Sequence, residues 1–120
     1  MKRPNVLLIC VEHWSGRLLG ALGHPVVQTP TVDQLASNGV LFTNAYSTTP
    51  VCIPARRELM TGTFSRTHGV RSFDETITMT GHTTLPESFR NAGYQTYAVG
   101  KLHVSPQRAR IGFDDVMLDE

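Results

Sequence analysis

The sequence of 120 residues lacks any long apolar run, and its charges nearly balance. No apolar stretch approaches the roughly 18 residues that a membrane-spanning helix requires, so we expect no membrane partner. The net charge is only +1, which gives no electrostatic basis for binding nucleic acid. Internal repeats and low-complexity tracts are also absent. We therefore expect one ordinary globular domain, since single domains cluster around roughly 100 to 150 residues.

Cysteine is scarce, with only Cys10 and Cys52 in the chain. Two cysteines so far apart in sequence make neither a disulfide framework nor a zinc cluster. Cys10 lies in the apolar run 6–11, and we expect it to be a core residue. The same run resembles the apolar part of a signal peptide, but no small-residue cleavage site follows it. A cytoplasmic location is therefore expected.

Strand-like and helix-like segments alternate along the chain, which is typical of α/β folds. The unbroken apolar run 6–11 indicates a strand that is buried on both faces of a parallel sheet. Two further β-prone segments, 39–46 and 94–100, are rich in valine and aromatic residues, and 111–118 starts another apolar element. The polar segment 72–84 is expected to be a long surface loop. Proline opens and glycine ends each expected helix, with starts at Pro30, Pro54 and Leu85-Pro86 and stops at Gly39, Gly62 and Gly93.

The most informative segment is 50–62, where Cys52 comes just before the proline that opens a helix. Unpaired amides and the helix dipole make such an N-terminus favourable for anions and for a reactive, deprotonated side chain. Arg56 lies one turn further along on the same face, where its guanidinium could fork onto a tetrahedral oxyanion. From helix geometry alone, a buried cysteine beside a surface arginine is an equally good interpretation.

This segment resembles the sulfatase signature C-x-P-[S/A]-R and its trailing L-x-T-G, with Cys52-Ile53-Pro54-Ala55-Arg56 followed by Leu59-Met60-Thr61-Gly62. The resemblance implies that residues 1–120 are the N-terminal portion of a sulfatase catalytic domain of the alkaline phosphatase superfamily. It also implies an α/β fold with a mostly parallel central sheet and flanking helices, incomplete at the C-terminus. The resemblance continues, in order and spacing, through 4–9, 29–36, 39–40, 42–46, 68–70, 85–86, 93–94 and 100–103.

The resemblance further implies a sulfuric ester hydrolase in which a separate maturation enzyme converts Cys52 to formylglycine. The hydrated aldehyde attacks the sulfur of a small-molecule or carbohydrate sulfate ester, and the gem-diol then collapses and expels sulfate. Arg56 is implied to hold the nucleophile, while Lys101 and His103 contact the sulfate and the leaving group. Lys101 and His103 are two residues apart on an expected extended segment, so their side chains should point the same way. Without the Cys52 motif, a solvated strand end is the better interpretation of this pair.

The implied metal site departs from the family pattern. The first strand of the family ends in two aspartates, or in Asp followed by Gln or Asn, which bind a divalent ion, with calcium expected over magnesium here. This chain has Glu12 and His13 instead. We expect Glu12 to be a ligand, with Cys52 and His13 as further candidates, although imidazole nitrogen matches a hard cation poorly. The alternative is that Glu12 and His13 merely cap a strand.

Other functions stay open. A phosphonate or phosphate monoester hydrolase of the same superfamily would use the same nucleophile arrangement, and a thiol hydrolase would use Cys52 with His103. A thiol phosphatase loop is disfavoured because it would need arginine where the chain has Glu58. A non-enzymatic α/β remnant that binds an anion or a partner subunit is a further alternative. Because the family completes its site with residues beyond the corresponding stretch, we expect the 120-residue chain to be inactive by itself.

Overall fold

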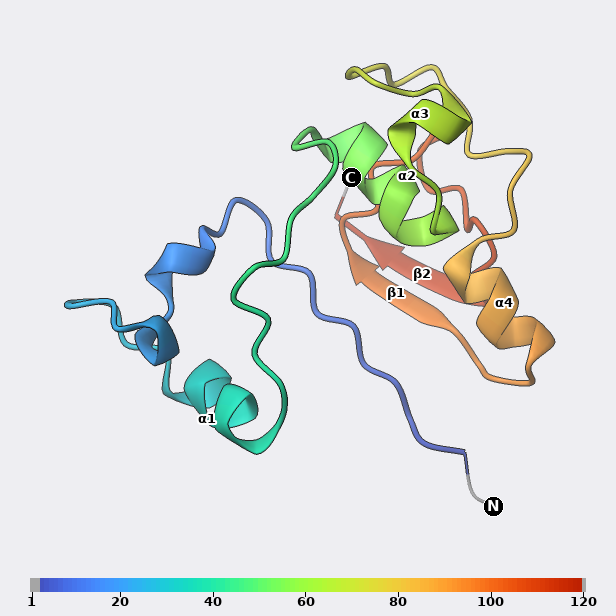
Figure 1. Ribbon diagram of the computed structural model, residues 1–120. Helices are drawn as coiled ribbons and strands as arrows, with labels where there is room; N and C mark the ends of the chain where they lie inside the picture. Colours follow the sequence, from blue (N-terminus) through green and yellow to red (C-terminus); the bar gives the residue numbers. More distant parts are fainter. Residues whose placement is uncertain (1–2, 120) are drawn as a thin grey trace. The chain divides into compact units, whose positions relative to one another are not determined.

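The computed structural model describes residues 3–119 and divides into two compact units, Met1–Ala45 and Tyr46–Glu120. Among the described residues, none of the helices combines the length and apolar character needed to span a membrane. The first unit contains the short 3-10 helices η1 (Gly16–Leu18) and η2 (Gly20–Leu22) and the helix α1 (Pro30–Asn38). The second unit contains the helices α2 (Cys52–Thr61), α3 (Ser65–His68) and α4 (Leu85–Asn91) and the strands β1 (Tyr97–Gly100) and β2 (Asp115–Leu118) (Figure 1).

In the first unit, Thr29 and Asp33 fasten α1 to η2. Thr29 immediately precedes α1, and its hydroxyl donates to Oδ1 of Asp33 at 2.7 Å. The amides of Gly20 and Ala21 donate to Thr29 Oγ1 and to Asp33 Oδ1, each at 2.8 Å. Amides at the start of a helix have no acceptor within it, so these two contacts satisfy the N-terminus of η2.

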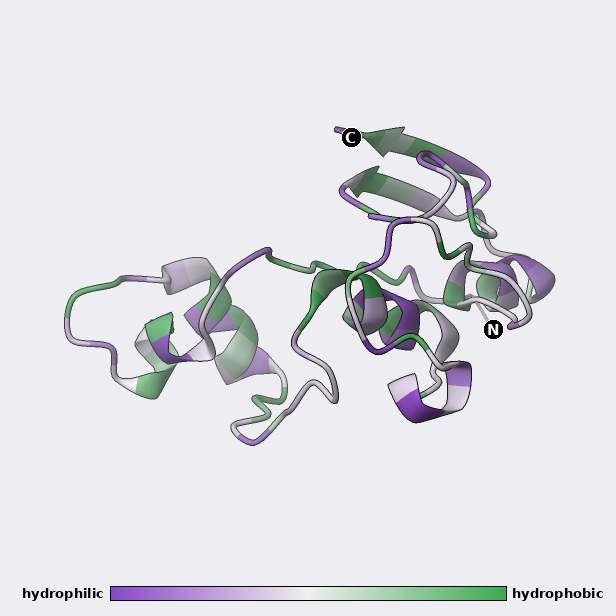
Figure 2. Cartoon of the chain, turned by 90° about the horizontal axis from the view of Figure 1, so that it is seen from above, coloured by the Kyte–Doolittle hydropathy of each residue, from purple (hydrophilic) through white to green (hydrophobic). Residues whose placement is uncertain are grey.

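In the second unit, β1 and β2 pair as parallel strands, beginning with Tyr97 opposite Asp115. Alternate residues of each strand are half-buried, whereas Tyr97, Val99 and Met117 are exposed at 63%, 81% and 73%. Figures 1 and 2 together show α2 and α4 on the same side of this sheet, and Figure 2 shows the apolar character of both strands. The predicted arrangement of parallel strands flanked by helices is therefore present as a two-stranded sheet.

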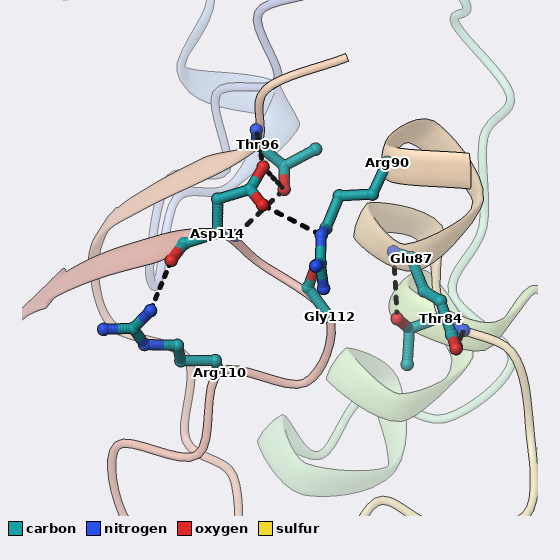
Figure 3. Close-up of polar contacts among 7 residues, drawn as sticks. All are labelled: Thr84, Glu87, Arg90, Thr96, Arg110, Gly112 and Asp114. Carbon is teal, nitrogen blue, oxygen red and sulfur yellow. Dashed lines mark hydrogen bonds and ion pairs between the residues drawn. The ribbon is translucent and has the colours of Figure 1, made fainter. Parts of the chain in front are cut away.

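The carboxylate of Asp114 joins both strands to α4 (Figure 3). It accepts from the amide and the hydroxyl of Thr96 at 2.8 and 3.1 Å, and the Asp114 amide donates to the Thr96 carbonyl at 2.9 Å. Nε of Arg90, in α4, lies 2.9 Å from the second carboxylate oxygen. The Thr96 amide, more than any other group, lowers the pKa of Asp114, and the Thr96 hydroxyl and Arg90 lower it further. Thr96 and Asp114 directly precede β1 and β2, so this cluster sets where the two strands begin.

The start of α4 is a capping box that packs against Gly112. The Thr84 hydroxyl accepts from the Glu87 amide at 3.3 Å, and the Glu87 carboxylate accepts from the Thr84 amide at 3.3 Å. The Thr84 hydroxyl also donates to the Ile111 carbonyl at 2.5 Å. A Cβ at Gly112 would lie only 2.7 Å from Thr84 Oγ1 and 2.8 Å from the Glu87 nitrogen, and φ there is +104°. Both the close approach and the left-handed backbone require glycine.

Glu58 holds α2 to the segments on both sides of it. Its Oε1 accepts from the Ser65 amide at 3.0 Å, from the Ser65 hydroxyl, and from the Thr49 hydroxyl at 3.1 Å. Burial by itself would raise the pKa of Glu58, but hydrogen bonds from Ser65, Thr48 and Thr49 outweigh burial and lower it. Thr49 lies just before α2 and Ser65 begins α3, so one ionised carboxylate fixes both ends of the helix relative to its neighbours.

Two of the predicted strands are missing from the described residues. Segments 6–11 and 39–46 contain no paired strand, and the large apolar residues of 6–11 are 55% to 84% exposed. The prediction that Cys10 is a core residue is wrong, since Cys10 is exposed. Apolar, valine-rich runs indicate β propensity, but a strand also needs a hydrogen-bonded neighbour. Within residues 3–119, only β1 and β2 pair as strands.

The three predicted helices are confirmed. α1 and α4 begin at Pro30 and Leu85. α2 begins at Cys52, two residues before the expected start at Pro54. Within α2, Met60 is buried, at 8% exposed, whereas the adjacent Leu59 is 40% exposed. Adjacent helical residues point about 100° apart, so only one of the two can face the interior fully.

Replacement of Gly112 by alanine, Gly112→Ala, is expected to lower the free energy of unfolding by about 2–4 kcal/mol, because the added Cβ overlaps the start of α4 in a left-handed backbone. Urea unfolding followed by circular dichroism measures the loss. Gly81→Ala is the matched control, since φ at Gly81 is +81° and an added Cβ there would meet nothing within 4 Å. Equal losses in the two variants would contradict the packing argument.

The substitution Glu58→Gln is expected to lower the free energy of unfolding by about 1–3 kcal/mol near neutral pH, because a charged acceptor is lost. The folded-state pKa of Glu58 is lowered, so its contribution is present above the unfolded-state pKa and is lost as the pH falls through the folded-state pKa. Urea midpoints of the two proteins should therefore converge as the solution is acidified. Asp119→Asn, at an exposed carboxylate, is the control. A difference that persists in acid would show that the Glu58 contacts do not depend on its charge.

Candidate active site

Cys52 is the first residue of α2 and is half-buried. The preceding Val51 provides no side-chain cap, and the first amides of an α-helix have no acceptor within the helix. The positive end of the helix dipole therefore lies beside the thiol, as the sequence predicts. Pro54, in the same turn, is fully buried and anchors the start of the helix.

Arg56 connects α2 to the segment that follows β1. Its Nη1 donates to the carbonyl oxygen of Lys101 at 2.6 Å, across 45 positions of sequence. β1 ends at Gly100, so the acceptor is on the first residue after the strand. The structure thereby brings together two predicted site residues, Arg56 and Lys101. Because the acceptor is a carbonyl, the bond fixes the backbone of Lys101 rather than its ammonium group.

His103 lies in the same unit, with its side chain 18% exposed. Its Nε2 is 3.4 Å from Oε1 of Glu75, and the Phe73 ring packs edge-on against the imidazole with 5.4 Å between centroids. The prediction of an extended segment is wrong at His103, where φ is +52° and the backbone is left-handed. The pairing of β1 with β2 stops at Gly100, and the next bridge is at Ser105, so His103 lies between paired positions. The expectation that the side chains of Lys101 and His103 point the same way assumed an extended backbone, which His103 does not have.

The predicted metal ligands Glu12 and His13 lie in the first unit. Nε2 of His13 is 3.5 Å from Oε1 of Glu12, and the two side chains are 89% and 36% exposed. Among residues 3–119, no three histidine, cysteine or acidic side chains cluster in a way that could hold a metal ion. Calcium takes about six to eight oxygen ligands, so one carboxylate and one imidazole do not fit a calcium site by themselves. The described residues therefore do not complete the predicted metal centre.

The structure reveals a buried arginine that sequence reasoning does not single out. Arg57 is only 7% exposed, and its Nη1 and Nη2 donate to the carbonyls of Thr78 and Thr80 at 2.8 and 3.0 Å. Burial lowers the pKa of Arg57 from its ordinary value. The segment 72–84 contains neither helix nor strand, as predicted, and Arg57 fastens this loop to α2. Nothing in the adjacent arginines at 56 and 57 signals which of them is buried.

His68 has a structural hydrogen-bonding position. Its Nδ1 accepts from the Val70 amide at 3.1 Å, just beyond α3. Burial, and next the nearby charge of Arg57, lower the pKa of His68 and favour its neutral form. Its other ring nitrogen is buried and has no partner among the described residues. The helix ends at Gly69, whose backbone is left-handed and whose amide donates to the Ser65 carbonyl, and the His68 ring accepts the next amide along.

Comparison with known proteins identifies the family. The sequence profile described as Sulfatase matches residues 4–119. An arylsulfatase of Clostridium perfringens is 36% identical over 118 residues, which cover 98% of this chain and 24% of that protein. An N-acetylglucosamine-6-O-sulfatase of Bacteroides thetaiotaomicron is 34% identical, over 94% of this chain and 20% of that protein. The chain thus spans about a quarter or less of the length of these curated relatives.

Solved structures agree with the sequence comparison. The phosphonate monoester hydrolase of Agrobacterium radiobacter gives a TM-score of 0.79 at 32% identity, over 97% of this chain and 26% of that one. A protein solved with its substrate D-glucosamine-2-N,6-O-disulfate gives a TM-score of 0.71 at 33% identity, over 83% of this chain and 20% of that one. The profile match extends over almost the whole sequence and includes the Cys52 motif at the start of α2, and it shows that this chain belongs to the sulfatase family.

Proposed function

We propose that this chain carries the nucleophile segment of a sulfuric ester hydrolase in which Cys52 becomes formylglycine. The observation that supports this most directly is the position of Cys52, the first residue of α2 within the family signature. Arg56 lies one turn further along, and its bond to the Lys101 carbonyl ties that turn to the segment that holds the other proposed catalytic residues. The substrate is a small-molecule or carbohydrate sulfate ester.

The proposed reaction proceeds through a gem-diol. A separate maturation enzyme, using an external two-electron oxidant, converts Cβ of Cys52 to an aldehyde and releases the sulfur as sulfide, and water then hydrates the aldehyde. One hydroxyl forms a new S–O bond to the substrate while the ester S–O bond breaks, and the alcohol leaves with a proton. The second hydroxyl then loses its proton, the C–O bond to sulfate breaks, and the aldehyde is restored. An ordinary serine alcohol would instead remain as a stable sulfate ester.

Each proposed catalytic residue has a distinct role. The amides and dipole at the start of α2 stabilise negative charge on the gem-diol and the sulfate. Arg56 holds the nucleophile, and Lys101 neutralises charge on the sulfate oxygens. His103, with Glu75 at 3.4 Å and Phe73 against its ring, protonates the departing alcohol.

A divalent ion is part of this proposal, with calcium favoured over magnesium. Glu12 offers one carboxylate, the converted Cys52 is a second candidate ligand, and His13 is a weaker one because its donor is nitrogen. These groups alone do not fill the coordination shell of calcium. The ion therefore enters the proposal through the family, and no role in the chemistry above depends on it.

A phosphonate monoester hydrolase is the second candidate function. The structural likeness to the enzyme of Agrobacterium radiobacter, at a TM-score of 0.79, favours it. The same nucleophile and cationic groups would act on a tetrahedral phosphonate. Parallel assays with 4-nitrophenyl sulfate and 4-nitrophenyl phenylphosphonate on the full-length protein separate the two, since the preferred ester turns over with the higher kcat/KM.

Protein produced beside a formylglycine-generating enzyme is expected to contain an aldehyde at Cys52. Peptide mass spectrometry after digestion, combined with capture by a hydrazide reagent, detects the conversion. Cys10 is an internal control, because it is exposed and lies outside the signature, and it should remain a thiol. A thiol that persists at Cys52 in such a host would favour the non-enzymatic or thiol-hydrolase alternatives.

Arg56→Lys is expected to reduce kcat for sulfate ester hydrolysis by about 10²-fold, because a compact ammonium cannot hold the Lys101 carbonyl and fork onto an oxyanion together. Sulfate release by the full-length protein measures the effect, after mass spectrometry shows that the variant still contains formylglycine. Arg71→Lys, at an exposed arginine, is the matched control. An unchanged kcat in Arg56→Lys would remove Arg56 from the proposed site.

A further inference from the structure

Two side chains of one loop hold the ring of His103. Phe73 and Glu75 both belong to the loop 72–84, whereas His103 follows the end of β1. The Phe73 ring meets the imidazole edge-on, with 5.4 Å between centroids and 67° between planes. Oε1 of Glu75 lies 3.4 Å from Nε2, while Nδ1 is buried. Nε2, the nitrogen that Glu75 faces, is therefore the one placed to exchange protons.

The contact with Glu75 determines which ring nitrogen carries a hydrogen. An ionised carboxylate has no hydrogen to donate, so Nε2 of His103 donates in this contact. The separation of 3.4 Å exceeds the usual length of such a bond, which is about 2.7 to 3.2 Å, so the hydrogen is held loosely. An oxygen that arrives at normal distance can take the place of Glu75 as acceptor. The contact thus orients the donor and still permits donation elsewhere.

The loop that carries Glu75 has a defined backbone course. Oδ1 of Asp74 accepts from the amide and the hydroxyl of Thr76 at 2.9 and 2.6 Å, so a turn closes around Glu75. Further along the same loop, Thr78 forms a parallel bridge with Ser105. The side chain of Glu75 is nevertheless 69% exposed. It can therefore move aside for another acceptor while the backbone of the loop stays in place.

We propose that Glu75 is a positioning residue for the proton that His103 gives to the departing alcohol. Glu75 aligns the Nε2–H bond and balances the positive charge that the ring carries before donation. The role in proton transfer rests on the proposed function, whereas the hold on the ring rests on the contacts alone.

The protons of the proposed cycle balance. As the ester S–O bond breaks, the alcohol oxygen takes the Nε2 proton of His103, and the attacking hydroxyl gives its own proton to water. As the C–O bond to sulfate breaks and the aldehyde is restored, the second hydroxyl returns a proton to Nε2. The same nitrogen serves both transfers, so the residue that orients it acts on both.

Leaving groups of different basicity test this role in the full-length protein. Glu75→Ala should lower kcat/KM for phenyl sulfate by about 10- to 100-fold and for 4-nitrophenyl sulfate by less than about threefold, because 4-nitrophenoxide departs without a proton. Asp119→Ala removes an exposed carboxylate outside the loop and should change neither value. Equal losses for the two esters would indicate a merely structural role and overturn the proposal, as would no loss for either.

A double substitution tests whether Glu75 acts through His103. In a His103→Asn background, Glu75→Ala should change kcat/KM for phenyl sulfate by less than about twofold, since coupled residues are not additive. Mass spectrometry first establishes that each variant contains formylglycine at Cys52. Losses in the two single variants that multiply in the double variant would overturn the proposal.

Proton–carbon correlation spectra of the histidine rings test the hold on His103 without any turnover. The Phe73 ring current displaces the His103 resonances, so in Glu75→Ala they should move toward those of an exposed histidine. Glu75→Gln keeps an acceptor oxygen and should leave them near their original positions. His68, whose ring accepts the Val70 amide in the same unit, is the internal control and should not move. Unmoved His103 resonances in Glu75→Ala would overturn the hold.

Failure of this proposal and failure of the proposed function are distinguishable. If the full-length protein contains no formylglycine and releases no sulfate, the proposed function fails, and the role of Glu75 in proton transfer is overturned with it. The His103 resonances still decide whether Glu75 holds the ring. If sulfate is released and Glu75→Ala leaves the ratio of the two esters unchanged, the proposed function stands and the role of Glu75 is overturned.

Discussion

The contacts of one carboxylate, Asp114, organise the second unit. By holding Thr96 on one side and Arg90 on the other, it fixes where β1 and β2 begin and how α4 lies against them. A slip of one residue in a strand turns every side chain to the opposite face, so a fixed start also fixes which residues are half-buried. β1 ends at Gly100, and the carbonyl of the next residue, Lys101, is the one that Arg56 reaches.

The helices of this chain follow from local chemistry, whereas two of the expected strands, 6–11 and 39–46, are not paired in the described residues. Proline at the first turn and glycine after the last are local signals, and they locate α1, α2 and α4 to within about two residues. A strand is completed by a neighbour that is remote in sequence, and the runs 6–11 and 39–46 carry no information about that neighbour. The four-residue α3 has no apolar periodicity from which it could be predicted. Its first residue, Ser65, is held by the carboxylate of Glu58.

The residues of the candidate site likewise divide into those that local sequence reveals and those that it does not. Cys52 and Arg56 are recognisable because a short signature contains both of them, and one helical turn relates them. Sequence reasoning does not single out three further residues, Arg57, Glu58 and Glu75. Each makes its hydrogen bonds with partners 7 to 28 positions away, which the sequence does not reveal. A charged residue in a sequence is exposed far more often than buried, so composition argues against a buried Arg57 until its acceptors are known. The left-handed backbone at His103 likewise cannot be predicted from the sequence.

Arg57 grips the loop 72–84 through the carbonyl oxygens of residues 78 and 80 rather than through their side chains. Carbonyl oxygens are the same whatever amino acid supplies them. Side chains along the loop can therefore be exchanged in the course of evolution while the anchor persists, provided that the backbone keeps its path. The contacts that hold the loop in place are thus separate from the side chains that the loop presents. Related enzymes with the same anchor could change their substrate preference without first losing their fold.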